Sequence, residues 1–217
     1  TDIGPLTKEN KLWDLTPNAI TKAYPKLHWN GQSSSAPDLT FLDRKVESVT
    51  LKRADDHTIN QVKLNLISPD TAKKLPSRSF AKTASQWKKL LDTRFKKKGT
   101  QLPFLKSKSF TQSTIAWKLD NAIYVLSARS TPLPSSLSLS IYDKEAGLIS
   151  LRKTVALSKK LKAKAEQERL AKIQDAKIGD VGKNLKGITS YLSGGSLSKK
   201  NISGSPKYYL FYFTASW

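Results

Sequence analysis

The spacing of apolar residues between Ser79 and Lys98 constrains the fold more than any other feature of the sequence. Five apolar residues recur there at i, i+4, i+7, i+11 and i+15, namely Phe80, Ala84, Trp87, Leu91 and Phe95. This spacing places them on one face of an amphipathic helix. Ser79 is a suitable N-cap, Gly99 is a suitable C-terminal stop, and basic residues crowd the carbonyl end. The segment therefore predicts a helix with one buried face.

The segments on both sides of this helix alternate apolar and polar residues, which is typical of half-buried strands. Before the helix, the alternating positions are Val49 and Leu51, then Val62, Leu64 and Leu66, with a hairpin loop at Asp55, Asp56 and His57. After it, two strands flank a turn at Asp120 and Asn121, and a third carries Leu137, Leu139 and Ile141. This order predicts an α+β fold, in which an antiparallel sheet is packed by one long amphipathic helix. Trp87, Trp117 and Tyr124 are expected in its core.

The two ends of the chain differ from this central part. Thr16 and Pro17 predict the start of a short helix that ends near Tyr24. A Lys-, Ala- and Glu-rich stretch from Leu151 to Ile178 predicts a basic helix ended by Gly179, and a Gly/Ser-rich connector follows. The predicted division is therefore an α+β domain at 1–147, a basic helix and linker at 148–206, and a final strand at 207–217.

The charge of the chain is strongly positive, with 38 Lys and Arg residues against 17 Asp and Glu residues and a formal net charge of +21. Such a chain attracts polyanions such as acidic glycans, nucleic acid or anionic membrane surfaces. Only seven of the basic residues are Arg. Because Lys acts as a flexible point charge, this balance favours non-specific attraction, or solubility alone, over readout of a base sequence.

Two groups of lysines form the predicted polyanion-binding surface. Lys82, Lys89 and Lys96 recur every seven residues on the predicted helix and continue into Lys97 and Lys98. The second group follows on the basic helix and consists of Lys159, Lys160, Lys162 and Lys164. Aromatic residues do not interleave these faces, which argues against dedicated recognition of single-stranded nucleic acid. The alternative interpretation is that both groups are solvated helix faces.

Motifs for catalysis and for metal or cofactor binding are absent from the sequence. The chain contains no cysteine, so zinc–thiolate sites, disulfides and thiol catalysis within it are excluded. His28 and His57 lie far apart in the sequence, and the chain has neither a phosphate-binding loop nor a Gly-x-Ser-x-Gly motif. We therefore predict a protein that is not an enzyme and holds no metal or cofactor. No apolar run reaches the roughly 18–20 residues of a membrane span, which predicts no transmembrane segment.

The last residues are dense in aromatic side chains, from Tyr208 to Phe213, and continue as Thr214-Ala215-Ser216-Trp217. The stretch from Phe211 to Trp217 resembles the strand that leads into the active site of thioredoxin-like and tryparedoxin-like proteins. In that family a Cys-x-x-Cys motif follows at once, and this chain lacks both cysteines.

The resemblance implies that the chain is the N-terminal module and linker of a secreted or periplasmic thiol-disulfide oxidoreductase, cut before its cysteines. The absence of methionine likewise predicts a processed or excised chain. The function expected on this basis is a non-catalytic interaction module, with a redox partner reached through the parent protein. Two alternatives stay open: residues 208–213 form an ordinary edge strand, or the chain is a polyanion-binding protein.

Overall fold

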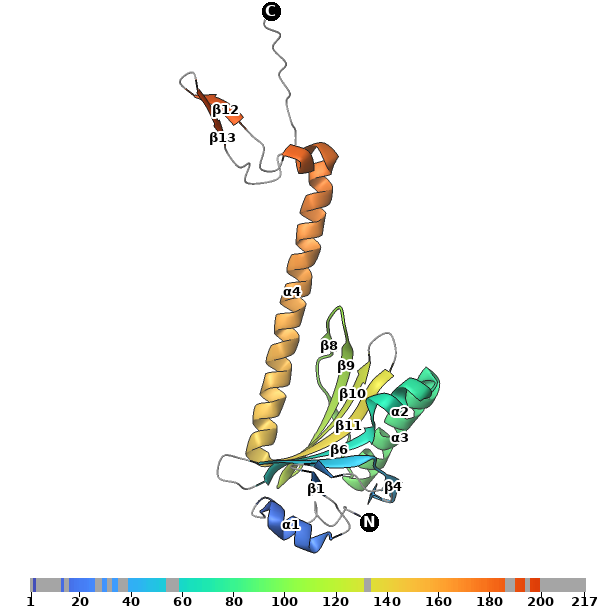
Figure 1. Cartoon of the computed structure of the whole chain (residues 1–217). Coiled ribbons are helices and arrows are strands. Elements are labelled where there is room, and N and C mark those ends of the chain that lie inside the picture. Colours follow the sequence, from blue (N-terminus) through green and yellow to red (C-terminus); the bar gives the residue numbers. More distant parts are fainter. Residues whose placement is uncertain are drawn as a thin grey trace, which may run out of the picture. The chain divides into compact units, whose positions relative to one another are not determined.

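The computed structural model describes residues 16–25, 29–30, 33–34, 39–53, 59–130, 134–185, 190–193 and 196–199, together with Asp2 and Trp13. The chain divides into two compact units, Thr1–Leu161 and Lys162–Trp217. The first unit combines helices with an antiparallel sheet, which confirms the predicted α+β class (Figure 1). This unit includes the start of the basic helix, whereas the sequence placed the domain boundary at residue 147.

The main sheet of the first unit has the strand order β1-β2-β5-β6-β11-β10-β9-β7, with β8 also paired to β9. All of these pairs are antiparallel. The strands are β1 (Trp29–Asn30), β2 (Ser33–Ser34), β5 (Ser48–Arg53), β6 (Ile59–Ile67), β7 (Thr100–Gln101), β8 (Leu105–Lys106), β9 (Thr111–Lys118), β10 (Ala122–Ser130) and β11 (Pro134–Asp143). The predicted hairpins β5–β6 and β9–β10 are present, and β11 joins them by pairing with both β6 and β10.

One face of the sheet packs against α2 (Pro69–Lys74) and α3 (Ser77–Arg94), as Figure 1 shows. The alternating apolar residues of β11 project from this face. Leu137, Leu139 and Ile141 are completely buried in the core beneath these helices. Trp87, Trp117 and Tyr124 are buried in the same core, as the sequence predicts. Aromatic contacts join the layers: the ring of Phe95 lies 4.6 Å from that of Tyr124, between centroids.

The ends of α3 differ from the prediction. Pro76 is the N-cap and provides no side-chain hydrogen bond, so the expectation that Ser79 caps the helix is wrong. Pro76 has the extended backbone conformation of an N-cap residue, with φ −58° and ψ 143°, so the helix begins at Ser77, three residues earlier than a cap at Ser79 would place it.

At the other end of α3, the backbone N–H groups of Lys96 and Lys97 donate to the carbonyls of Thr93 and Asp92, and Lys96 has a φ of 48°. This is a Schellman motif with Lys96 at the position that glycine usually occupies. Gly99 is therefore not the helix stop.

The basic helix α4 (Lys144–Leu185) begins directly after β11 and not at Leu151 as expected. Asp143 caps it, because its Oδ1 accepts a hydrogen bond of 2.8 Å from the backbone N–H of Ala146. The expectation that Gly179 ends the helix is also wrong, since the helix continues to Leu185. The helix contains three glycines, Gly147, Gly179 and Gly182, and its many strong helix formers offset the cost of about 1 kcal/mol that each interior glycine carries relative to alanine.

The first turns of α4 cover the second face of the sheet. Leu151 is buried there against Ala116, Ile123 and Val125, which alternate with the residues that face α3. Further along, the buried Ser158 donates a hydrogen bond of 3.1 Å to the carbonyl oxygen of Phe104. The sheet of the first unit is thus covered by α2 and α3 on one face and in part by α4 on the other.

The remaining elements are small. Helix α1 (Pro17–Ala23) is capped by Thr16, as predicted. Strands β3 (Thr40–Phe41) and β4 (Arg44–Lys45) form a hairpin whose two turn residues, Leu42 and Asp43, both have positive φ. In the second unit, β12 (Ser190–Ser193) and β13 (Ser196–Lys199) form a hairpin within the predicted connector. The predicted loop at Asp55 to His57 and the predicted strand at 207–217 lie outside the described residues.

Candidate polyanion interface

All nine lysines of the predicted polyanion-binding surface are exposed. They do not form a single group. Lys82 and Lys89 lie on α3, and Lys96, Lys97 and Lys98 lie in the turn after it. On α4, Lys159 and Lys160 belong to the first unit, whereas Lys162 and Lys164 belong to the second.

The two lysines on α3 lie on the side of the helix opposite its buried residues. Lys82 and Lys89 are seven residues apart, which corresponds to about 10.5 Å along the helix axis. Arg78 lies four residues before Lys82 and is exposed on the same side, although it is not among the predicted residues. Its i, i+4 relation to Lys82 is the sequence signal that indicates this shared side.

The positive charge on α2, α3 and the following turn has almost no internal compensation. Residues 69–98 contain ten basic residues and two acidic ones. Both acids already have a basic partner, since Asp70 pairs with Lys73 at 3.3 Å and Asp92 pairs with Lys88. The other eight basic residues of this segment are all exposed, and we call them the α2–α3 surface: Lys74, Arg78, Lys82, Lys89, Arg94, Lys96, Lys97 and Lys98.

The turn after α3 carries Lys96, Lys97 and Lys98, and we call it the lysine turn. Asp92 holds this turn in place. The Oδ1 atom of Asp92 accepts hydrogen bonds from the backbone N–H of Gly99, at 2.8 Å, and from Nε1 of Trp117, at 2.9 Å. Burial by itself raises the pKa of Asp92. The hydrogen bonds from Lys88, Gly99 and Trp117 outweigh this effect, so that the pKa lies below its usual value. Asp92 therefore stays ionised and ties the end of α3 to β9.

Gly99 is needed where the lysine turn meets the sheet. A Cβ atom at this position would lie 2.5 Å from Cγ2 of Ile115 and 2.6 Å from the ring of Trp117. Only glycine allows the backbone to come this close to β9. The turn that carries Lys96, Lys97 and Lys98 is thus fixed by packing as well as by Asp92. In addition, Nζ of Lys97 donates a hydrogen bond of 3.0 Å to the carbonyl oxygen of Lys118.

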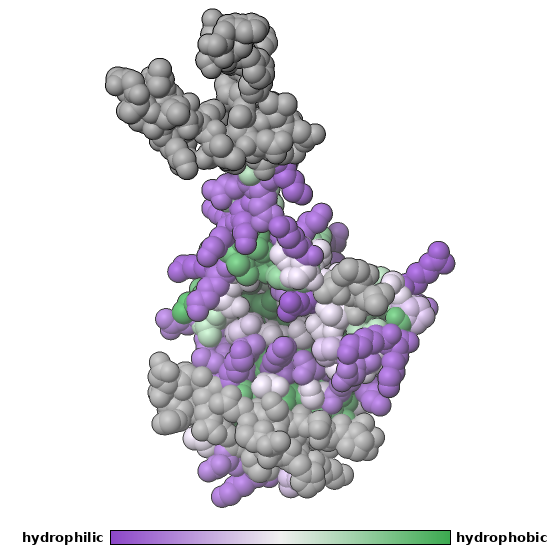
Figure 2. All heavy atoms as spheres, turned by 45° about the horizontal axis from the view of Figure 1, so that its top comes forward, coloured by the Kyte–Doolittle hydropathy of each residue, from purple (hydrophilic) through white to green (hydrophobic). Residues whose placement is uncertain are grey.

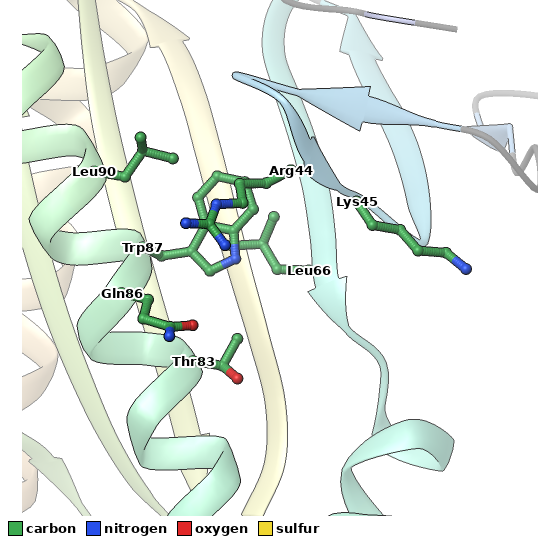
Figure 3. Close-up of a pocket in the computed structure, with 7 residues that line it drawn as sticks. All are labelled: Arg44, Lys45, Leu66, Thr83, Gln86, Trp87 and Leu90. Carbon is green, nitrogen blue, oxygen red and sulfur yellow. The ribbon is translucent and has the colours of Figure 1, made fainter.

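A small pocket of about 160 Å³ lies beside α3, under the β3–β4 hairpin. Thr83, Gln86 and Trp87 come from the helix, and in the view of Figure 3 the side chain of Arg44 lies over the ring of Trp87, whereas Lys45 points away. Trp87 is fixed by a stacked contact with Phe41 on the same hairpin. The guanidinium of Arg44 and the carboxamide of Gln86 can both donate hydrogen bonds to an anionic group in this pocket, whereas the Thr83 hydroxyl already donates to the carbonyl oxygen of Ser79 at 3.0 Å.

On the face shown in Figure 2, hydrophilic residues, in purple, cover much of the described surface, with hydrophobic residues, in green, between them. Among the described residues, no group of three or more His, Cys, Asp or Glu side chains is placed to hold a metal ion. None of the helices, over the described residues, is both long and apolar enough to cross a membrane.

Comparison with known proteins adds no relative: no family model, no curated protein and no solved structure matches the chain. The residues that carry the resemblance to thioredoxin-like proteins, Phe211 to Trp217, lie outside the described residues. That resemblance stays a prediction.

Proposed function

We propose that this protein is a non-catalytic interaction module that binds an extended polyanion through the α2–α3 surface. The observation that carries the proposal is the charge balance of residues 69–98, in which both carboxylates are already paired and eight exposed basic side chains are left. Such an uncompensated cluster attracts polyanions and concentrates them near the surface.

The spacing of the charges favours a polymer or an extended anionic surface over a small ligand. Lys82 and Lys89 are separated by about 10.5 Å along α3, and Arg78 continues the same side of the helix by another turn, so the charges form a row along the helix. The pocket beside Trp87 offers a place for one group of the same polymer. Six of the eight residues are Lys, so the ligand is recognised by its charge density and not by a bidentate pattern.

The test is a titration with a heparin fragment and with a DNA duplex over a range of salt concentrations. The variant carries Lys82→Gln, Lys89→Gln and Lys98→Gln, which leave Lys96 and the end of α3 intact. We expect its affinity to fall at least about tenfold. The slope of log K against log salt for the duplex should become shallower by about 0.9 for each lysine that contacts a phosphate.

The matched control removes three positive charges elsewhere, at the exposed residues Lys22, Lys106 and Arg152, each changed to Gln. This control should bind with nearly the affinity of the unmodified protein. An equal loss in both triple variants would show that only net charge matters, and it would overturn the proposal. A Lys159→Gln, Lys160→Gln variant tests whether the lysines of α4 contribute to polyanion binding, and we expect a smaller loss of affinity there.

The resemblance of residues 211–217 to a thioredoxin-like strand supports a second proposal, that this module accompanies a redox domain in a secreted or periplasmic protein. The module itself has no thiol, so its role in such a protein is binding and not dithiol exchange. The coding sequence beyond Trp217 tests this proposal. Codons for Cys-x-x-Cys directly after Trp217 are expected, and any unrelated continuation contradicts it.

A further inference from the structure

A second concave site lies on the other face of the sheet, between the first turns of α4 and strands β5, β6 and β11. It is a groove with a volume of about 510 Å³, which lies in the range of small-molecule sites. All of its lining residues belong to the first unit. None of them is on the α2–α3 surface, so this groove is a separate site.

The floor of the groove is set by the register of three neighbouring strands. Lys52 on β5 pairs with Gln61 on β6, and Gln61 pairs with Tyr142 on β11. Directly opposed residues in an antiparallel sheet project from the same face. Lys52, Gln61 and Tyr142 therefore stand in one row across the sheet, although 90 positions separate the first from the last in the sequence.

Gln61 orients the hydroxyl group of Tyr142. It is only 7% exposed, and its Nε2 donates to the hydroxyl oxygens of Ser140, at 3.1 Å, and of Tyr142, at 3.2 Å. The Tyr142 hydroxyl thus accepts a hydrogen bond from Gln61, and it donates none to another described residue. Its proton is available to a ligand in the groove, with the oxygen held in a defined position.

The wall of the groove comes from α4 and combines charge with apolar surface. Lys153 lies one helical turn from both Ile149 and Leu157, so these three residues share one side of the helix. Ile149 is 44% exposed and Leu157 is 42% exposed, so both side chains offer apolar surface to a ligand in the groove. The lining contains two lysines and no carboxylate. Positive charge and apolar surface therefore occur together in this groove.

We propose that the groove binds a small organic carboxylate with an aliphatic tail. The carboxylate accepts hydrogen bonds from the ammonium groups of Lys52 and Lys153 and from the hydroxyl group of Tyr142. The tail covers Ile149 and Leu157. Charge-assisted hydrogen bonds to a carboxylate are stronger than neutral ones, and apolar contact adds affinity in proportion to the area removed from water. This site needs no polyanion, and its ligand is independent of the function proposed for the α2–α3 surface.

The experiment is calorimetric titration of the full chain with decanoate, below the concentration at which decanoate forms micelles. Decanamide, which has the same tail but no charge, is titrated in parallel. We expect saturable binding of one decanoate per chain and binding of decanamide weaker by about tenfold or more. A Lys52→Gln, Lys153→Gln variant and a Tyr142→Phe variant should each weaken decanoate binding, the first by about tenfold or more. Leu157→Asn should weaken decanoate and decanamide alike.

The matched control for charge is Lys82→Gln with Lys89→Gln. It also removes two positive charges, but from the α2–α3 surface, and it should leave decanoate binding unchanged. All variants are checked for an unchanged far-UV spectrum and thermal midpoint, and the groove variants should keep their affinity for heparin. Absence of saturable binding, equal binding of decanamide, or an equal loss in the Lys82/Lys89 control would each overturn the proposal. These outcomes leave heparin binding unaffected, so the two proposals fail independently.

Discussion

At the scale of single residues, Asp92 connects stability to the candidate interface. Its pKa is lowered because the hydrogen bonds from Lys88, Gly99 and Trp117 outweigh the opposing effect of burial. A carboxylate with a lowered folded-state pKa stabilises the fold fully above its unfolded pKa of about 3.9, and this contribution is lost as the pH falls through the folded pKa. We predict that Asp92→Asn costs about 1.5–3 kcal/mol at pH 7 and makes the free energy of unfolding less dependent on pH below about 4.

Urea unfolding followed by tryptophan fluorescence between pH 2 and pH 7 measures the loss of stability in Asp92→Asn and the change in its pH dependence. The control is Asp70→Asn, because Asp70 is also paired with a lysine but its side chain is 89% exposed. Exposed pairs of this kind contribute about 0–1 kcal/mol, so Asp70→Asn should change little at any pH. A similar loss in the two variants would mean that the bonds to Gly99 and Trp117 do not stabilise the fold.

At the scale of elements, Gly147 controls how α4 meets the sheet. A Cβ atom at this position would lie 2.6 Å from Cβ of Ile123 on β10, so Gly147→Ala must push the helix away from the strand. Alanine gains about 1 kcal/mol in helix propensity, whereas overpacking costs about 1–3 kcal/mol. We predict a net loss of stability in thermal unfolding. Ala156→Gly at an exposed site on the same helix measures the propensity term alone, and stabilisation by Gly147→Ala would contradict the prediction.

The same elements show what can be predicted from the sequence. The buried stripe of α3 and the strands around it were predictable, because periodicity reports which side of an element is apolar. The ends of α3 and α4 could not be predicted in this way. Lys96 takes the positive φ that glycine usually provides at a helix stop, and Gly147, near the start of α4, allows the close approach to Ile123.

Of the two candidate sites, the α2–α3 surface was largely predictable from the sequence and the groove was not. The exposure of the predicted lysines followed from their composition and spacing. The row of Lys52, Gln61 and Tyr142 arises from strand register, which no local pattern reveals.

At the scale of the whole molecule, the first unit contains both candidate sites and both hydrophobic clusters. The larger cluster, with its buried residues between Ile20 and Ile141, fills the space between the sheet and α3. The smaller one, formed by Ala116, Ile123, Val125 and Leu151, is closed by α4. Leu151 is the last residue of either cluster, so among the described residues the second unit adds none to them. The first unit should therefore fold and bind without the second.

We predict that a fragment of residues 1–161 unfolds cooperatively, within a few degrees of the full chain, and keeps its affinity for heparin. A fragment of residues 1–143 lacks α4 and uncovers Ile123 and Val125. Loss of the buried Leu151 alone costs about 1.5–3 kcal/mol, and in a domain of this size each kcal/mol lowers the thermal midpoint by about 2–4 °C. The shorter fragment should thus melt about 5–10 °C lower in differential scanning calorimetry. It should also lose decanoate binding while it still binds heparin below its midpoint, because its α2–α3 surface is intact. Equal midpoints for the two fragments would show that α4 does not stabilise the sheet, and a broad, non-cooperative transition of the 1–161 fragment would show that the first unit depends on the second.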